Sequence, residues 1–197
     1  PRGARIERNV LGNGRGGGYS ISGADGVILA DNDILGSDLQ ATGGGVNTLF
    51  ARVGYSVHVL ARRNRFRSFF GWDREAMTTD GPGGFFYGRV AMAGERTLTL
   101  LGPPTDRYDY PDWRGGGVFV MAGAGVGEWA RVVARNGAEV QIDRPLPTPP
   151  DATSLVSIAP MQGQHLFIDN DFEDAAFAVQ LYGTSIETVI AGNRSSL

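Results

Sequence analysis

An asparagine that returns at a fixed spacing is the feature that most limits how this chain can fold. Five short segments align around it without gaps, and their asparagines are Asn9, Asn32, Asn64, Asn170 and Asn193. Asn9 and Asn32 are 23 residues apart, and so are Asn170 and Asn193. The other two spacings, 32 and 106 residues, correspond to one repeat of 23 with an insertion of 9 and of 83. A fixed period of this length is typical of chains whose repeats stack as a solenoid.

The residues around each asparagine predict which solenoid this is. One coil of a parallel β-helix has about 20–25 residues, and equivalent positions stack about 4.8 Å apart. The residue two places after each asparagine should face the interior, and four of these five residues are large and apolar: Leu11, Ile34, Phe66, Phe172 and Ser195. We expect the asparagines to take the left-handed backbone of a rung corner and to bond to one another along the stack. The alternative is a β-sandwich with coincidental asparagine turns.

Charges on both sides of the asparagines make the register of the stack testable. The preceding residues are Arg8, Asp31, Arg63, Asp169 and Gly192, and the following residues are Val10, Asp33, Arg65, Asp171 and Arg194. Stacked rungs would therefore alternate Arg and Asp, and opposite charges on adjacent strands are favourable. Each exposed pair contributes only about 0.2–1 kcal/mol, so its main effect is on register. We predict that Arg8, Asp31, Arg63 and Asp169 stack in that order, as do Asp33, Arg65 and Asp171.

The longest interruption of the repeat predicts a separate module. We expect β-helix rungs in 1–80 and 163–197 and an inserted β-rich module in 81–162, which is too long for a loop. Strand patterns occur at 96–101, 117–121, 129–133, 139–143 and 154–158, with a hairpin turn at Asn136-Gly137. The fold class is therefore all-β: a right-handed parallel β-helix with an inserted small β-barrel or sandwich.

With the asparagine repeat and the insertion in view, the chain resembles the pectin-lyase-like right-handed parallel β-helix proteins. That superfamily contains polysaccharide lyases, glycoside hydrolases, epimerases and phage tailspikes, and the resemblance covers about 1–80 and 163–197. Within the insertion, 123–131 and 150–158 look like a segment of bacterial β-helix and phage surface proteins. The resemblance implies a carbohydrate-active protein that is secreted or on a bacterial cell surface. No catalytic residue of the superfamily carries over, because neither its calcium-binding nor its paired-aspartate motif matches here.

The densest polar stretch lies where the rungs give way to the insertion. It contains Asp73, Arg74, Glu75 and Asp80, and in a strand Asp73 and Glu75 would share one face. Two such carboxylates could act as acid and base or nucleophile in glycoside cleavage. They could instead bind Ca²⁺, which prefers several oxygen ligands. A third possibility is a salt-bridged junction that anchors the insertion, so we treat these four residues as catalytic candidates and expect no cofactor beyond a possible Ca²⁺.

Aromatic residues near this stretch are candidates for sugar stacking. Trp72 precedes the carboxylates, and Tyr108, Tyr110 and Trp113 lie in a mixed polar and aromatic segment. Aromatic side chains more often fill cores, and we expect this of Phe69, Phe70 and Phe85. The leading hypothesis is cleavage of a polysaccharide by hydrolysis or β-elimination. The alternative is a non-catalytic glycan-binding or structural surface or tail-fibre-like β-helix.

Composition excludes some partners and chemistries. The net charge is −3 with no basic block, which argues against nucleic acid as a partner. There is no Cys, which excludes a disulfide or a catalytic thiol, and no apolar run long enough to span a membrane. The repeat runs almost to both ends of the sequence, and unpaired end rungs are normally capped. We therefore expect either the rest of a longer chain or end-to-end self-association.

Overall fold

The computed structural model describes residues 2–12, 19–36, 46–49, 56–69, 75–80, 84–102, 113–181 and 184–196, with 47–49 and 80 described by backbone alone. Within these ranges the regular secondary structure is all strand. The chain forms two compact units. The first contains Pro1–Gly81 and Gln162–Leu197, and the second contains Pro82–Met161.

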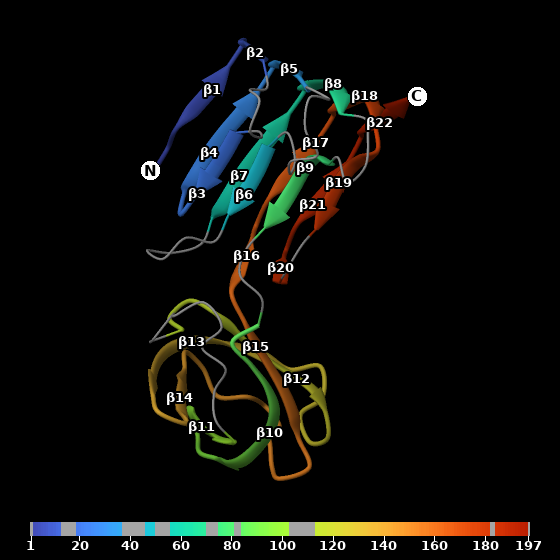
Figure 1. Cartoon of the computed structure of the whole chain (residues 1–197). Coiled ribbons are helices and arrows are strands. Elements are labelled where there is room, and N and C mark those ends of the chain that lie inside the picture. The colour runs from blue at the N-terminus through green and yellow to red at the C-terminus, as the bar shows by residue number, and fades with distance from the viewer. Residues whose placement is uncertain are drawn as a thin grey trace. The chain divides into compact units, whose positions relative to one another are not determined.

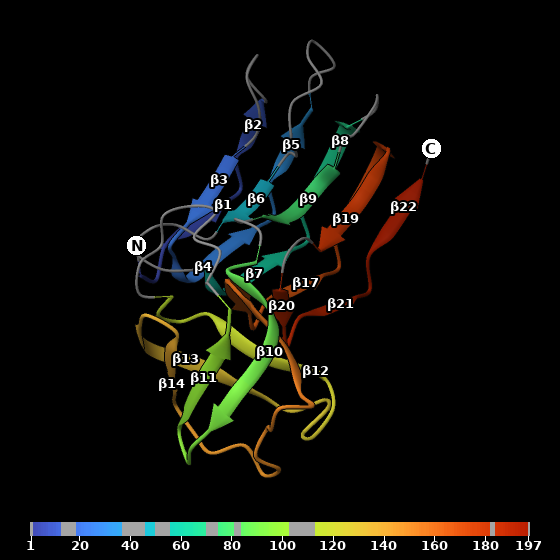
Figure 2. The same cartoon turned by 60° about the horizontal axis from the view of Figure 1, so that its bottom comes forward.

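Three sheets of parallel strands make up the first unit (Figures 1 and 2). One sheet contains β1 (Arg5–Glu7), β4 (Asp25–Ala30), β7 (Val57–Arg62), β16 (Met161–Gly163), β17 (Leu166–Ile168), β20 (Thr184–Ile186) and β21 (Val189–Ala191). The second contains β2 (Val10–Gly12), β5 (Asp33–Leu35), β8 (Arg65–Phe69), β18 (Asp171–Ala175) and β22 (Arg194–Ser196). The third contains β3 (Tyr19–Ser22), β6 (Val46–Leu49), β9 (Glu75–Asp80) and β19 (Phe177–Leu181).

The chain visits these three sheets in turn, so each pass adds one strand to each sheet. β1, β2 and β3 form one rung, and β4, β5 and β6 pair with them as the next. β7, β8 and β9 form the third rung, on which β17, β18 and β19 stack. This is the winding of a parallel β-helix. The parallel pairing rules out the β-sandwich alternative for this unit.

An apolar stack two places after the asparagines fills the interior, as the repeat predicted. Leu11 is aligned with Ile34, Ile34 with Phe66, Phe66 with Phe172, and Phe172 with Ser195. Ile34 and Phe66 are completely buried. The rings of Phe66 and Phe172 are stacked with centroids 5.0 Å apart. Burial of such side chains contributes about 1.5–3 kcal/mol each, so this stack is a main source of β-helix stability.

The asparagines form a continuous hydrogen-bonded ladder, which also confirms the prediction. Each Oδ1 from Asn32 onward accepts two bonds from the preceding rung. Asn64 Oδ1, for example, accepts from the backbone N–H of Asn32 at 3.1 Å and from Asn32 Nδ2 at 2.9 Å. Asn64 Nδ2 donates to Asn170 Oδ1 at 3.0 Å and to the Leu29 carbonyl at 2.8 Å. The side chains of Asn32, Asn64 and Asn170 are buried but fully satisfied, which is the condition for placing amides in a core.

The left-handed backbone of the corner lies one residue earlier than expected, so that part of the prediction is wrong. Positive φ angles occur at the residue before each asparagine: Arg8 (58°), Asp31 (57°), Arg63 (51°), Asp169 (55°) and Gly192 (67°). The turn at this residue lets the asparagine side chain point into the rung, where the ladder holds it. The residue with the left-handed backbone therefore has an exposed side chain. The asparagine that follows it supplies the two N–H donors and the carbonyl oxygen of the ladder.

The charged stacks have the predicted register, and the Arg63–Asp31 pair of the first stack agrees with the prediction, while the second stack pairs differently. Asp31 donates its backbone N–H to the Arg62 carbonyl and Arg63 to that of Ile168, so the corner residues follow one another up the helix. Arg63 Nε and Nη2 each lie 2.7 Å from the Asp31 carboxylate, and this contact lowers the pKa of Asp31. The second stack, Asp33, Arg65 and Asp171, is also in register.

The ion pairs of this second stack run diagonally along the sheet. Arg67 contacts Asp33, and Arg65 contacts Glu173. Each arginine therefore pairs with a carboxylate two positions away along the strand direction, on the same face, and not with the residue directly across from it. The register was predictable from alternating charge, but the partner of each guanidinium depends on the reach of its side chain.

A closed barrel of six antiparallel strands forms the second unit (Figure 2). Its strands are β10 (Phe86–Ala93), β11 (Thr97–Leu101), β12 (Gly117–Ala122), β13 (Trp129–Asn136), β14 (Glu139–Ile142) and β15 (Leu155–Ala159). The order around the barrel is β10-β11-β14-β13-β12-β15. Sequence patterns located five of these strands and missed β10. A register shift between Val90 and Met92 interrupts the alternation of buried and exposed residues in that strand.

Candidate functional site

The polar stretch proposed as catalytic is described only in part. Glu75 begins β9, where its side chain is 7% exposed and its backbone is aligned with Phe177 of β19. The next two residues of the strand, Ala76 and Met77, belong to the apolar core. Glu75 is therefore positioned by a core strand. Asp73, Arg74 and Trp72, together with the side chain of Asp80, lie outside the described residues.

Trp113 does not offer the exposed face that sugar stacking requires, so this part of the prediction disagrees with the structure. It is 1% exposed. The Phe85 ring stacks parallel to the Trp113 ring, with the two centroids 5.4 Å apart. The Arg135 guanidinium carbon lies 4.0 Å from the centroid of the Trp113 ring. Trp113 is a core residue of the barrel unit. Tyr108 and Tyr110, the other two candidates from this segment, lie outside the described residues.

A row of aromatic side chains crosses the outer surface of the barrel instead. Alternation in the strands sends Phe86, Val118, Ala130 and Ile158 inward, where all are buried, and sends their neighbours outward. The outward residues are aligned across four adjacent strands. Tyr87 of β10 is opposite Ser157 of β15, Ser157 is opposite Phe119 of β12, and Phe119 is opposite Trp129 of β13. We call Tyr87, Ser157, Phe119 and Trp129 the aromatic row.

The aromatic row spans three strand spacings, or about 14 Å. Tyr87 at one end is 69% exposed, while Phe119 and Trp129 are half-buried. The rings of Phe119 and Trp129 are stacked, with centroids 6.2 Å apart and planes 21° apart. Ser157 places a hydroxyl between the tyrosine and this pair. The row is thus an extended, mostly apolar strip with polar groups at its end and near its middle.

Two arginines border the Trp129 end of the aromatic row. The guanidinium carbon of Arg144 lies 4.5 Å from the centre of the Trp129 ring, and Arg144 Nη2 donates to the Trp129 carbonyl at 3.0 Å. The guanidinium carbon of Arg131 lies 6.0 Å from the same ring. The Arg131 backbone is fixed by an N–H bond to Asp143 Oδ1 at 2.9 Å. Cation–π contacts of this kind contribute about 0.5–1 kcal/mol when exposed, and they hold planar donors beside an aromatic surface.

The two histidines lie in opposite environments. The exposed His58 has Nδ1 2.8 Å from Asp25 Oδ1, and this contact lowers the pKa of Asp25. His165 is completely buried, and its Nδ1 accepts the Val59 backbone N–H at 3.3 Å. Burial lowers the pKa of His165 to about 4, so it is neutral at physiological pH. The two side chains do not form a shared site.

The described part of the chain contains no group of three or more His, Asp or Glu side chains arranged to hold a metal ion. It also contains no helix long and apolar enough to cross a membrane.

The sequence contained a signal for the aromatic row that was not decisive. Phe119 lies in the strand pattern at 117–121, and Trp129 lies in the one at 129–133. In a barrel strand every second residue faces outward, so Phe119 could have been recognised as a surface position. The missing information was the register that aligns Tyr87, Phe119 and Trp129 across four strands.

The fold and the surface together define a parallel β-helix protein with an inserted six-stranded barrel that carries an aromatic and arginine surface. No family model and no curated protein matches the chain. Among solved structures, the tailspike gp61 of Pseudomonas phage phi297 is similar, with 16% identity and a TM-score of 0.33. That alignment covers 77% of this chain and 28% of the tailspike.

Proposed function

We propose that this chain is a carbohydrate-binding β-helix protein and that the aromatic row of the barrel is its polysaccharide-binding surface. The observation that carries the proposal is the alignment of Tyr87, Phe119 and Trp129 along one line of the outer barrel surface. Sugar rings stack their apolar faces on aromatic side chains, and a linear strip suits a linear chain of sugars better than a compact ligand.

Polar groups beside the row supply the second part of glycan recognition. Sugar hydroxyls need donors and acceptors at the edge of a stacking surface. Ser157 provides a hydroxyl, and Arg131 and Arg144 place guanidinium groups near Trp129. Because arginine donors form a rigid, planar fork, they can bond to adjacent oxygens without a large loss of side-chain freedom.

A polysaccharide panel tests the proposal directly. The full chain would be run by affinity electrophoresis through gels that each contain one soluble polysaccharide, and Kd would be obtained from the retardation. For a retained polysaccharide, we expect Tyr87→Ala and Trp129→Ala each to weaken binding about 2- to 12-fold, the effect of losing one aromatic contact. Tyr87→Phe keeps the ring and should retain most of the affinity.

The matched control is Met92→Ala, because Met92 is 66% exposed on the same strand as Tyr87 but outside the aromatic row. This variant should bind like the wild type. Equal weakening by Met92→Ala and Tyr87→Ala would show that general apolar exposure, and not the row, is responsible. Retention that no variant of the row changes would contradict the proposal.

We extend this proposal to cleavage of the bound polysaccharide by the polar stretch that contains Glu75. The proposed catalytic group remains Asp73, Arg74, Glu75 and Asp80, with Ca²⁺ as a possible ligand of the same carboxylates. New reducing ends would indicate hydrolysis, and absorbance of an unsaturated product would indicate β-elimination. Glu75→Gln should abolish either signal without changing retardation. Retardation with no product in any buffer, with or without Ca²⁺, would identify a binding protein alone.

The proposal extends to the setting in which the protein acts. We propose a right-handed β-helix, because crossover connections between parallel strands have that hand in about 98% of cases. A polysaccharide ligand places the protein outside the cell or on a surface. A longer chain, or a second copy stacked on an end rung, would continue the asparagine ladder.

A further inference from the structure

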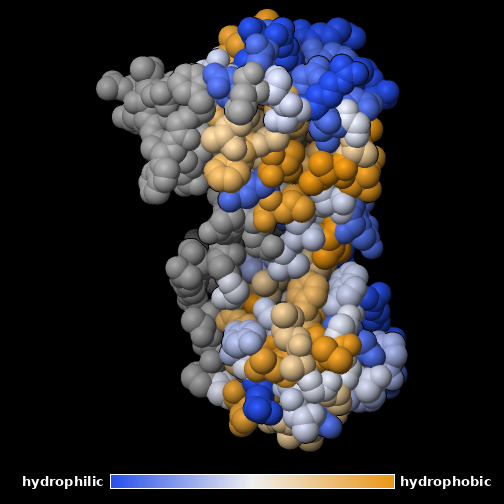
Figure 3. Space-filling view, turned by 90° about the vertical axis from the view of Figure 1, so that its right-hand side faces the viewer, coloured by the Kyte–Doolittle hydropathy of each residue, from blue (hydrophilic) through white to orange (hydrophobic). Residues whose placement is uncertain are grey.

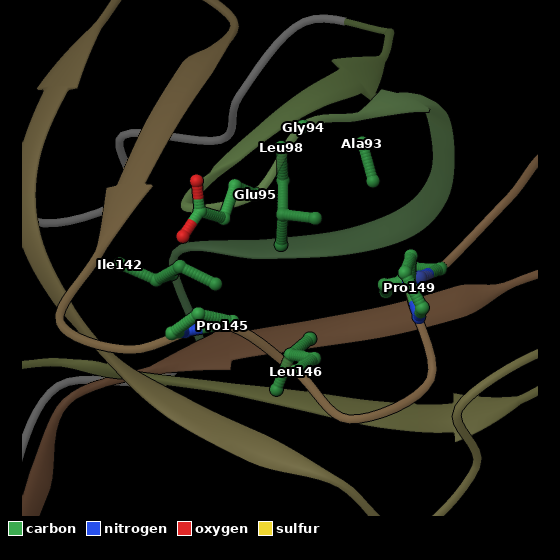
Figure 4. Close-up of a pocket in the computed structure, with 9 residues that line it drawn as sticks. Ala93, Gly94, Glu95, Leu98, Ile142, Pro145, Leu146 and Pro149 are labelled. Atoms are coloured by element: carbon green, nitrogen blue, oxygen red, sulfur yellow. The ribbon is translucent and has the colours of Figure 1, made fainter.

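A cavity of about 330 Å³ opens in the barrel unit (Figure 4). None of the residues that line it belongs to the aromatic row. The cavity lies between the turn that joins β10 to β11 and the proline-containing segment that follows β14. Its buried walls are Leu98, Ile142 and Leu146, which are 1%, 3% and 6% exposed. A volume near 300 Å³ is at the lower end of the range of small-molecule sites.

The cavity is formed by rigid parts of the chain. One wall comes from strands β11 and β14, which are paired in the barrel. The opposite wall comes from the segment after β14, where Pro145, Pro149 and Pro150 line the cavity. Each proline fixes its own φ angle, so this wall loses little conformational freedom when a ligand binds. The turn between β10 and β11 is closed by a bond from the Gly94 N–H to the Thr97 carbonyl at 2.8 Å.

One carboxylate lies at the rim of this otherwise apolar cavity. Of the described lining residues, Glu95 alone is charged. Figure 4 shows its carboxylate on the same side of the cavity as Ile142 and Pro145. The nearest arginines in sequence are directed to other places. Arg144 lies over the Trp129 ring, and Arg96 lines a separate depression with Gln141 and Asp143.

We infer that this cavity is a binding site for a compact apolar cation, such as an alkylammonium group, independent of the polysaccharide surface. The apolar body of the ligand is buried against Leu98, Ile142 and Leu146. Its ammonium group remains at the rim, where it forms an ion pair with Glu95. A neutral ligand of the same shape gains the apolar contact alone, and a carboxylate ligand is repelled at the rim.

Three ligands with the same six-carbon chain test this inference. Hexylammonium, 1-hexanol and hexanoate would each be titrated into the full-length chain and followed by NMR of the methyl groups. We expect hexylammonium to bind about two- to fivefold tighter than 1-hexanol, the effect of one exposed ion pair. Hexanoate should bind more weakly than both. Shifts should be concentrated in the methyl groups of Leu98, Ile142 and Leu146.

Two variants separate the contribution of the Glu95 charge to ligand binding from the contribution of the apolar cavity. Glu95→Gln is an exposed change, and it should remove the difference between hexylammonium and 1-hexanol while leaving the binding of 1-hexanol unchanged. Ala93→Trp places a large ring in the cavity and should reduce the binding of all three ligands. If that variant does not fold by circular dichroism, the wild-type methyl shifts decide the location. Equal affinity for the three ligands, no binding, or shifts elsewhere in the chain would overturn the inference.

Discussion

Removing a central asparagine from the ladder should destabilise the β-helix far more than removing the asparagine at its end. The Asn64 side chain takes part in four hydrogen bonds, two as donor and two as acceptor. At about 0.5–1.5 kcal/mol net for each bond, Asn64→Ala should cost about 2–6 kcal/mol. The upper half of this range applies where the groups left behind stay buried without partners. Asn32 and Asn170 are 2% and 0% exposed, so water cannot readily replace the lost amide.

Asn9→Ala is the matched control, because it removes the same amide from an exposed position. The Asn9 side chain donates to Asn32 Oδ1 at 3.1 Å and to the Glu7 carbonyl at 2.9 Å. Asn32 Oδ1 still accepts the Asn9 backbone N–H at 3.0 Å after the change. Two bonds at a hydrated site give an expected cost of about 1 kcal/mol.

Urea unfolding followed by circular dichroism measures both costs, and hydrogen exchange locates them. In Asn64→Ala, the Asn32 amide should lose protection, because its backbone N–H donates to Asn64 Oδ1. Asn64→Asp adds a sharper test, since it keeps the acceptor and replaces the two donor bonds by contacts between oxygens. It should be at least as destabilising as alanine at neutral pH. If Asn64→Ala costs no more than Asn9→Ala, the ladder does not stabilise the fold in the way described.

Four other substitutions have outcomes that follow from the structure. The pKa of His165 is about 4 in the folded chain against 6.5 for an unperturbed imidazole, so the unfolded chain binds the extra proton first as pH falls. Stability should therefore decline between pH 6.5 and 4 by about 3 kcal/mol, and urea midpoints of His165→Leu should lack this decline. Gly163→Ala should prevent folding of the β-helix, because φ is +153° and the added Cβ would lie 2.0 Å from the Ile186 carbonyl oxygen. Gly127→Ala, with φ +87° but no atom within 4 Å, should cost only about 1–2 kcal/mol by thermal unfolding. Arg63→Gln removes the exposed ion pair with Asp31 and should lower the urea midpoint only slightly, and the difference from wild type should disappear in 1 M salt.

The rungs were predictable because several independent properties of the sequence agree at each repeat. The asparagine, the apolar residue two places later and the flanking charges all return together, so the register follows from local pattern alone. The position of the left-handed corner was not predictable in this way. It depends on which of two neighbouring residues, Asp31 or Asn32 for example, has its side chain inside the rung.

The candidate surface was harder to predict than the scaffold, because it depends on non-local register. Tyr87 and Trp129 are 42 residues apart in the sequence and are brought into one row by pairing across β15 and β12. Trp113 illustrates the opposite error. Its residue type suggested an exposed role in sugar stacking, but an aromatic ring can instead be buried in a core, and only tertiary packing determines this.

The direction of the hydrogen bonds in the asparagine ladder has a consequence for symmetry. Between asparagines, every side-chain N–H donates toward the C-terminal rung, while the second N–H of each amide donates to a backbone carbonyl of its own or the preceding rung. The Asn9 end of the ladder therefore presents an Oδ1 acceptor, and the Asn193 end presents a backbone and a side-chain donor. Two Asn9 ends brought together would oppose acceptor to acceptor, and two Asn193 ends would oppose donor to donor. A rung added from any source can extend the ladder only head to tail. The last two rungs also expose Phe177, Leu181, Val189 and Ile190, and Figure 3 shows hydrophobic side chains gathered on that side of the β-helix. Stacking through the ladder is therefore compatible with a polar, one-directional fibre and incompatible with a twofold dimer.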